Sequence, residues 1–169
     1  IEMAKAAIGA FNMKVIYHNR GPRPELEAEL NGATYVTFDE LLAQSDVISL
    51  HANLTAENTK KFNKDAFAKM KKTSILINTA RGKMVDEEDL KVALKEGVIW
   101  GAGLDVTDPE PMKYDNELLT MENVAVLPHI GSATIETRLA MWDLCGTNAV
   151  AGMSGKVDIP SCINPEAKQ

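Results

Sequence analysis

Five short apolar runs recur along the chain, and helical patterns separate them. The runs cover residues 14–18, 46–51, 74–79, 100–106 and 124–129. Continuous apolar character over so few residues is typical of strands buried on both faces, as in a parallel sheet. The helical patterns cover residues 1–12, 39–43, 64–71, 87–96 and 133–153. Strand and helix therefore alternate, which predicts βαβ units with right-handed crossovers and an α/β fold.

The start of the chain departs from the usual nucleotide-binding pattern. Such a domain opens with an apolar strand and a G-x-G-x-x-G turn, but helical spacing begins here at residue 1 and no such motif occurs. Gly9 stands alone inside that helix and fits a close-packing position better than a phosphate loop. Either the chain is a fragment, or it does not bind a nucleotide.

Under the first alternative, the chain would be a Rossmann-like, doubly wound parallel sheet that lacks its first strand and Gly-rich loop. In the usual strand order the first strand lies at the centre of the sheet, between the second and the fourth. Its loss would leave two sheet edges unpaired and the pyrophosphate without its cradle.

The composition argues against several classes of partner and site. With 24 Asp+Glu, 18 Lys+Arg and only 5% aromatic residues, the chain is unsuited to nucleic acid or an anionic membrane surface. No apolar run approaches the roughly 20 residues needed to span a bilayer, and no signal-peptide layout is present, so we expect a cytoplasmic protein. Cys145 and Cys162 have no metal-ligand or redox spacing, so neither a metal site nor a disulfide framework is expected.

Ligands of open α/β sheets bind beyond the carboxyl ends of the strands, so the residues after each run are informative. Asn19, Arg20 and Arg23 follow the first run. A carboxylate there would hold ribose hydroxyls, whereas basic residues suit the 2′-phosphate of NADP. This pattern favours NADP, with NAD as the alternative. Taken alone, however, the two arginines are better explained as solvated loop charges.

Asn53 follows the second run and Arg81 follows the third. Asn53 would either donate to a cofactor or make a local Asx-turn, and His51 just before it is the kind of strand-end histidine that is usually packed or hydrogen-bonded. Arg81 precedes Gly82, which permits unusual backbone angles, and this arrangement would aim a guanidinium at a small carboxylate. A salt-bridging arginine at a turn explains Arg81 equally well.

Acidic residues follow the fourth run and a histidine ends the fifth. Asp105 lies at an apolar strand end, which is a costly place for a carboxylate unless it is partnered or used. Glu110 stands between two prolines, and His129 lies just before a helix N-terminus. Each acid is also explained as a turn residue. Together, however, Arg, Asp, Glu and His at one sheet edge predict an enzyme with acid–base chemistry.

Three strings, in this order, resemble a known family: INTARG with Arg81, GLDVTDPEP with Asp105 and Glu110, and LPHIGSAT with His129. They are similar to the D-isomer-specific 2-hydroxyacid dehydrogenases, particularly to the branch that reduces glyoxylate and hydroxypyruvate. NRGPRP and LHANLTAENT extend the similarity through most of the chain. The resemblance favours the first alternative and implies a Rossmann-like fold without its first strand and Gly-rich loop. The chain would be the C-terminal half of a longer, homodimeric reductase, with little or no activity of its own.

The resemblance also implies a role for each candidate residue. Arg81 would bind the substrate carboxylate and carbonyl, His129 would be the general acid/base, and Glu110 would hold the imidazole and raise its pKa. Asp105 and Ser132 would line the nicotinamide and substrate pocket. The implied cofactor-binding residues are Arg20, Arg23, Asn53, Thr79 and Gly131.

The implied reaction is the NAD(P)H-dependent reduction of a small 2-oxoacid, glyoxylate or hydroxypyruvate, to the 2-hydroxyacid, and it requires no metal. Two alternatives stay open: another dehydrogenase of the family, of the phosphoglycerate or lactate type, or a non-catalytic truncated nucleotide-binding module. We expect residues 1–132 to be a partial dinucleotide-binding domain. Residues 133–169 would form a C-terminal helix and tail that return to a substrate domain.

Overall fold

The computed structural model describes residues 1–30, 32–154 and 161–163. It divides into two compact units, an N-terminal unit, Ile1–Pro128, and a C-terminal unit, His129–Gln169. The N-terminal unit contains every strand, and the C-terminal unit contains the last helix. Part of the expected C-terminal tail, residues 155–160 and 164–169, lies outside the described residues.

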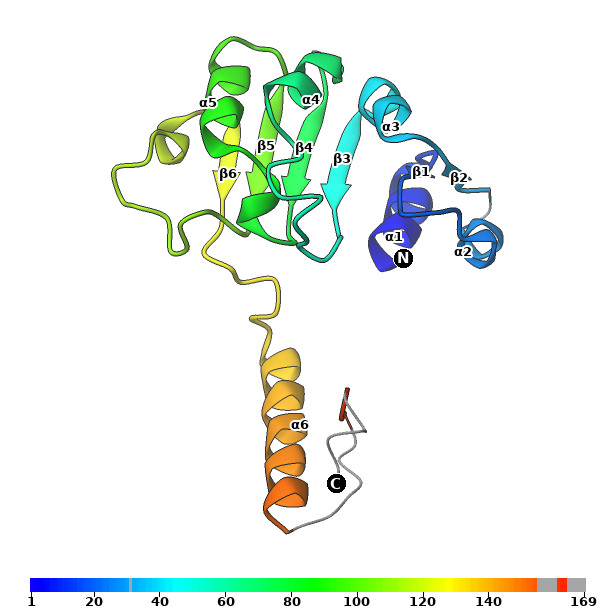
Figure 1. Ribbon diagram of the computed structural model, residues 1–169, viewed down its shortest axis with the longest axis vertical. Coiled ribbons are helices and arrows are strands. Elements are labelled where there is room, and N and C mark those ends of the chain that lie inside the picture. The colour runs from blue at the N-terminus through cyan, green and yellow to red at the C-terminus, as the bar shows by residue number, and fades with distance from the viewer. Residues whose placement is uncertain (31, 155–160, 164–169) are drawn as a thin grey trace. The chain divides into compact units, whose positions relative to one another are not determined.

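A four-stranded parallel sheet forms the centre of the N-terminal unit (Figure 1). Its strands lie in the order β3-β4-β5-β6. They are β3 (Val47–Leu50), β4 (Ile75–Asn78), β5 (Gly101–Leu104) and β6 (Val124–Val126). Each falls inside one of the predicted apolar runs, so the predicted α/β fold with a parallel sheet is confirmed.

A second, two-stranded parallel sheet precedes it, made of β1 (Ile16–Tyr17) and β2 (Thr34–Tyr35). In the doubly wound order the second and fourth strands flank the first, and here those strands are β1 and β3. Within the described residues no strand joins them, since β3 ends one sheet and β1 pairs only with β2. The sheet is thus divided at the place expected for the missing first strand.

Caps recognisable in the sequence begin the helices around the four-stranded sheet. The helix α3 (Phe38–Gln44) starts with a capping box, in which Thr37 and Glu40 each bind the other's backbone N–H. Asn63 caps α4 (Lys64–Lys69), and Asp86 caps α5 (Glu87–Lys95). These helices lie where helical periods were predicted.

The remaining helices of the N-terminal unit lie outside this core arrangement or in its loops. The helix α1 (Glu2–Phe11) was expected, whereas α2 (Pro24–Glu29) and β2 were not. Because α2 has the sequence PELEAE, it lacks the apolar period by which the other helices were recognised. Two short 3₁₀ helices, over Gly82–Met84 and Glu117–Thr120, lie in the loops after β4 and β5.

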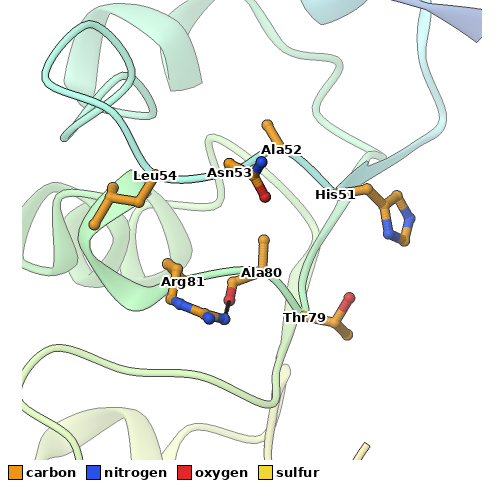
Figure 2. Close-up of a pocket in the computed structure, with 7 residues that line it drawn as sticks. All are labelled: His51, Ala52, Asn53, Leu54, Thr79, Ala80 and Arg81. Atoms are coloured by element: carbon orange, nitrogen blue, oxygen red, sulfur yellow. Dashed lines mark hydrogen bonds between the residues drawn. The ribbon is translucent and has the colours of Figure 1, made fainter. Parts of the chain in front are cut away.

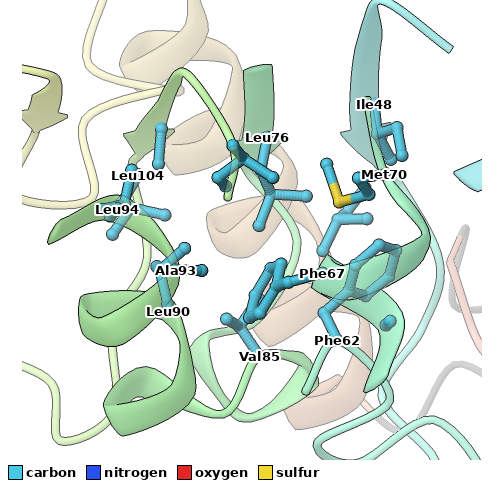
Figure 3. Packing of buried hydrophobic residues seen from close by; sticks show 14 of the residues in the cluster. Ile48, Phe62, Phe67, Met70, Leu76, Val85, Leu90, Ala93, Leu94 and Leu104 are labelled. Atoms are coloured by element: carbon cyan, nitrogen blue, oxygen red, sulfur yellow. The ribbon is translucent and has the colours of Figure 1, made fainter. Parts of the chain in front are cut away.

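The core lies between the four-stranded sheet and the helices α3, α4 and α5 (Figure 3). Phe67 of α4 and Leu90 of α5 are among its fully buried side chains, as is Leu76 of β4. Complete burial of one such side chain stabilises the fold by about 1.5–3 kcal/mol. Burial of apolar side chains therefore stabilises the packing of the sheet against these three helices.

The expectation that the strands are buried on both faces was wrong for this sheet. In β4, Leu76 and Asn78 are buried, whereas Ile75 and Ile77 on the opposite face are only half-buried. The buried face meets α3, α4 and α5. On the opposite face the sheet contacts α1, where the Ser49 hydroxyl donates to Met3 Sδ at 3.1 Å.

The C-terminal unit contains one long helix, α6 (Ile135–Met153), which begins at the Thr134 cap. Large apolar side chains on it are exposed, including Ile135, Leu139, Trp142 and Met153. No helix of the described residues has both the length and the apolar character needed to cross a membrane.

Candidate active site

The carboxyl ends of β3, β4 and β5 meet at one edge of the sheet. Asn78, the last residue of β4, is in register with the last residues of β3 and β5. Residues His51, Thr79 and Asp105 therefore leave the sheet side by side, at the start of three adjacent loops. This is the edge at which open α/β sheets bind their ligands.

A pocket of about 430 Å³ opens between the loops after β3 and β4 (Figure 2). Its volume falls in the range of small-molecule sites, roughly 300–1,000 Å³. The lining residues are His51, Ala52, Asn53, Leu54, Thr79, Ala80 and Arg81. Three residues predicted from two motifs, Asn53, Thr79 and Arg81, are thus brought together in one pocket.

Arg81 is exposed and lies on extended backbone directly before the 3₁₀ helix. Its Nη1 donates to the carbonyl oxygen of Ala80 at 2.6 Å, the dashed line in Figure 2. A guanidinium presents several coplanar donors, so an arginine held at a pocket mouth can bind a carboxylate through two parallel hydrogen bonds.

Asn78 holds the turn that carries Arg81. Its side chain is 1% exposed, Nδ2 donates to the Arg81 carbonyl oxygen at 3.0 Å, and Oδ1 accepts from the Ala80 N–H at 3.1 Å. Sequence reasoning did not select Asn78, although an amide side chain inside an otherwise apolar run was a usable signal.

Gly82, the next residue after Arg81, approaches the loop after β5 very closely. A Cβ at this position would lie 2.0 Å from the carbonyl oxygen of Thr107 and 2.7 Å from the N of Asp108. Only glycine fits between the two backbones, so the turn after β4 and the loop after β5 are fixed against each other.

The loop after β3 is ordered by Asn58. Its Nδ2 donates to the Asn53 carbonyl oxygen at 2.7 Å, and its Oδ1 accepts from the Thr55 N–H at 2.8 Å. The backbone of Asn53, and not its side chain, makes this contact. The Asn53 amide lies at the pocket, as Figure 2 shows.

His51 also lines the pocket, although it was not among the predicted site residues. Its Nε2 lies 2.9 Å from the Ser49 hydroxyl, so its interpretation as a hydrogen-bonded strand-end histidine is confirmed. Burial lowers the pKa of His51. Near pH 7 the imidazole is therefore mainly neutral.

Asp105 and Glu110 do not line this pocket. Asp105 is 7% exposed, directly after β5, and its N–H donates to the Asn78 carbonyl oxygen at 2.9 Å. Glu110 is exposed in the following loop, where the Thr107 hydroxyl donates to the Pro109 carbonyl oxygen at 2.8 Å. Of the two acids, Asp105 is therefore the buried carboxylate at a strand end that the sequence predicted.

His129, Gly131 and Ser132 belong to the C-terminal unit. His129 is exposed and has a φ of 54°, in the left-handed region that few residues other than glycine adopt. Ser132 is half-buried. Because Arg81 and Glu110 belong to the other unit, the meeting of the three proposed catalytic side chains stays a prediction.

Arg20 and Arg23 lie after β1, as predicted, but their surroundings differ. The backbone N–H of Arg23 donates to the Tyr17 hydroxyl at 2.6 Å, and its guanidinium forms an ion pair with Glu25. The hydrogen bond that the Arg23 guanidinium donates to Glu25 lowers the pKa of the Glu25 carboxyl group. Arg20 is exposed in the same loop.

The residues that the structure describes contain no group of three or more His, Cys, Asp or Glu side chains placed to hold a metal ion. The polar groups at the pocket are amide, hydroxyl, imidazole and guanidinium groups. The neutral hydrogen-bonding groups suit an uncharged heterocycle, and the guanidinium suits a small anion.

Comparison with known proteins identifies the family. Residues 2–131 match the model of the D-isomer specific 2-hydroxyacid dehydrogenase NAD binding domain. The chain is 47% identical to a glyoxylate reductase of Thermococcus litoralis over 97% of its length, and 44% identical to a glyoxylate/hydroxypyruvate reductase B of Escherichia fergusonii, also over 97%. These alignments cover 48% and 50% of the two relatives.

Solved structures agree with this result. The TT0316 protein from Thermus thermophilus superposes with a TM-score of 0.85 at 42% identity, over 93% of this chain and 48% of that one. A glyoxylate reductase from Paecilomyes thermophila superposes with a TM-score of 0.79 at 44% identity, over 89% and 44%. The chain thus spans about half the length of these relatives. The chain therefore belongs to the D-isomer specific 2-hydroxyacid dehydrogenases, and residues 2–131 correspond to their NAD-binding domain.

Proposed function

We propose that this chain is the cofactor-binding part of a reductase that uses NAD(P)H to convert a small 2-oxoacid, glyoxylate or hydroxypyruvate, to the 2-hydroxyacid. The observation that carries the proposal is the pocket in which Asn53, Thr79 and Arg81 meet at the carboxyl edge of the sheet. The relatives at 44–47% identity are named for these two substrates.

The pocket fits the nicotinamide end of the cofactor. Ala52 and Ala80 leave room for a planar ring, and Asn53 and Thr79 offer an amide and a hydroxyl to its polar groups. Gly131 would contact the cofactor from the C-terminal unit. The bound cofactor supplies a hydride to the keto carbon. The Gly-rich turn that would hold the pyrophosphate does not occur in the sequence.

Arg81 orients the substrate in this mechanism. Its guanidinium binds the carboxylate through paired hydrogen bonds and stabilises negative charge that develops on the neighbouring carbonyl oxygen. The fixed turn between Asn78 and Gly82 supports this role, because catalysis by positioning requires a side chain whose backbone does not move.

His129 donates the proton to the developing alkoxide, and Glu110 holds the imidazole. A carboxylate that accepts a hydrogen bond from one ring nitrogen orients the imidazole, so that the other ring nitrogen can transfer a proton. The left-handed backbone of His129 supports a functional role, since strained residues gather at active sites. Asp105 and Ser132 line the nicotinamide and substrate pocket in this proposal.

The adenosine end determines the choice between NADP and NAD. We favour NADP because Arg20 and Arg23 follow β1 where a carboxylate would otherwise bind the ribose hydroxyls. Arg23 is paired with Glu25, so Arg20 is the better candidate for the 2′-phosphate.

We propose that the full-length protein is a homodimeric, cytoplasmic enzyme. Residues 1–132 would form part of its dinucleotide-binding domain. Residues 133–169 return to the substrate domain. The exposed apolar side chains of α6, among them Leu139 and Trp142, support this arrangement because they suit a protein interface better than water. The lactate-type alternative has weaker support, since a D-lactate dehydrogenase from Lactobacillus jensenii is 32% identical.

A chimera tests the proposal. The segment of the Thermococcus litoralis glyoxylate reductase that precedes its similarity to this chain would be joined to residue 1, and NADPH oxidation would be measured with glyoxylate. We expect turnover in the chimera and little or none in the 169-residue chain alone. A chimera that folds and binds NADPH but reduces neither glyoxylate nor hydroxypyruvate would rule the proposal out.

A further inference from the structure

We infer that Asn78 is a positioning residue for Arg81: its buried amide sets the turn from which the guanidinium reaches the substrate carboxylate. The inference rests on the proposed function of Arg81. It adds a residue that touches neither substrate nor cofactor and acts through the backbone.

Both functional groups of the Asn78 amide are used on the same turn. Nδ2 donates to the carbonyl oxygen of Arg81, and Oδ1 accepts from the N–H of Ala80. The side chain is 1% exposed, so these contacts form out of water, where an unpaired amide would be costly. The requirement for one donor and one acceptor on a short side chain is met by asparagine.

The backbone of Asn78 fixes the other end of this arrangement. Asn78 is the last residue of β4, held between β3 and β5, and its carbonyl oxygen accepts from the Asp105 N–H at 2.9 Å. The amide therefore connects a strand that is paired on both sides to the backbone of Arg81.

The turn is also fixed on its far side. Gly82 lies so close to Thr107 that a Cβ would overlap the carbonyl oxygen. Arg81 is thus held between a hydrogen-bonded anchor and a close backbone contact. Only its side chain is left to adjust to the ligand.

Ser74 provides a matched control at the other end of β4. Like Asn78 it is a fully buried polar residue, and its hydroxyl donates to the Lys71 carbonyl oxygen at 2.7 Å. Ser74→Ala also removes buried hydrogen bonding from β4's flank, but it leaves the turn around Arg81 untouched.

The test uses the chimera described above with NADPH bound, oxamate as a stable analogue of a 2-oxoacid, and ¹⁵N NMR. Arg81→Gln defines the part of the oxamate affinity that depends on the guanidinium. In Asn78→Ser we expect the Kd for oxamate to rise about tenfold, the effect of one displaced charge-assisted hydrogen bond. We also expect faster amide exchange at Ala80. Ser74→Ala should change both quantities less than about twofold.

Asn78→Asp separates the two contacts and serves if the serine variant does not fold. The ionised aspartate keeps the acceptor for Ala80 but loses the donor to Arg81. Protection of the Ala80 amide should persist while the oxamate affinity falls. Unchanged affinity and unchanged backbone order at Arg81 in a folded Asn78 variant would overturn the inference.

The two proposals fail in different ways. If the chimera without these substitutions shows no oxamate affinity that depends on Arg81, the proposed function of Arg81 fails. Loss of order at residues 80–82 in the Asn78 variants, but not in Ser74→Ala, would then still support the positioning inference. If both Asn78 variants and Ser74→Ala weaken oxamate binding equally, Asn78 is only a stabilising residue and the inference is wrong.

Discussion

Replacement of Gly82 by alanine tests the close contact that joins the Arg81 turn to the loop after β5. The added Cβ would lie 2.0 Å from the Thr107 carbonyl oxygen and 2.1 Å from its carbon. Real Cβ atoms essentially never approach other heavy atoms within 3.0 Å, so one of the two backbones must move by about 1 Å. Overpacking of this kind typically costs about 1–3 kcal/mol.

We expect Gly82→Ala to reach the upper end of that range, about 3 kcal/mol, because both partners are backbone and neither can rotate away. That is a large part of the roughly 5–15 kcal/mol that stabilises a domain. Urea unfolding followed by far-UV circular dichroism would give the change in the free energy of unfolding, and the variant should also bind oxamate more weakly.

Gly9→Ala is the matched control. A Cβ at Gly9, inside α1, would meet nothing within 4 Å, so the expectation that Gly9 is a close-packing position was wrong. Alanine is favoured over glycine in a helix interior by up to about 1 kcal/mol, so this variant should be slightly more stable than the parent. If Gly82→Ala unfolds within about 0.5 kcal/mol of the parent chain, the close contact does not constrain the turn and the reasoning is refuted.

Three further predictions concern charge, cofactor choice and capping. Lys60 Nζ lies 3.0 Å from Asp86 Oδ2 and lowers the pKa of the Asp86 carboxyl group. The stabilisation from this ion pair is therefore present above the unfolded pKa of about 3.9 and is lost as the pH falls through the lower folded pKa. In urea titrations between about pH 5 and pH 2, Asp86→Asn should therefore flatten the acid-side loss of stability, and an unaltered profile would contradict this. In the chimera, Arg20→Ala should raise the KM for NADPH much more than that for NADH; equal losses would make Arg20 a loop charge. Thr37→Ala should cost about 1 kcal/mol by removing the capping box of α3, as measured by thermal unfolding, whereas a change below about 0.3 kcal/mol would speak against it.

Much of the fold was predictable because strands and helices differ in apolar period. The run at 74–79 predicted β4, and the helical pattern at 87–96 predicted α5, which ends just before Gly97 with its φ of 64°. The two-residue strand β2 was missed because pairing with β1, and no local pattern, creates it.

The error about burial has a physical cause. An apolar run shows that a strand is covered, but the covering elements decide which face is buried. In β4 the helices of the core cover Leu76, and the opposite face, with Ile75 and Ile77, stays half-buried. Sequence alone did not show that the described helices gather mainly on one side.

The candidate site was predictable in its residues but not in its supports. Asn53, Thr79 and Arg81 follow strand ends, and the topology of a parallel sheet brings them to one edge. Asn78 and the close approach at Gly82 depend on distances between backbones, which no spacing in the sequence encodes. The three proposed catalytic side chains come from two units, so their meeting depends on more than either unit alone.

The central claim is that this chain contributes proton transfer and cofactor binding to a 2-oxoacid reductase. The most direct measurement compares the chimera with its His129→Ala variant for glyoxylate-dependent NADPH oxidation and for NADPH affinity. We predict a loss of kcat of about 10²–10⁴-fold, typical of a missing general acid, with an unchanged Kd for NADPH. Turnover equal to that of the unmodified chimera would contradict the proposed role of His129 and with it the mechanism.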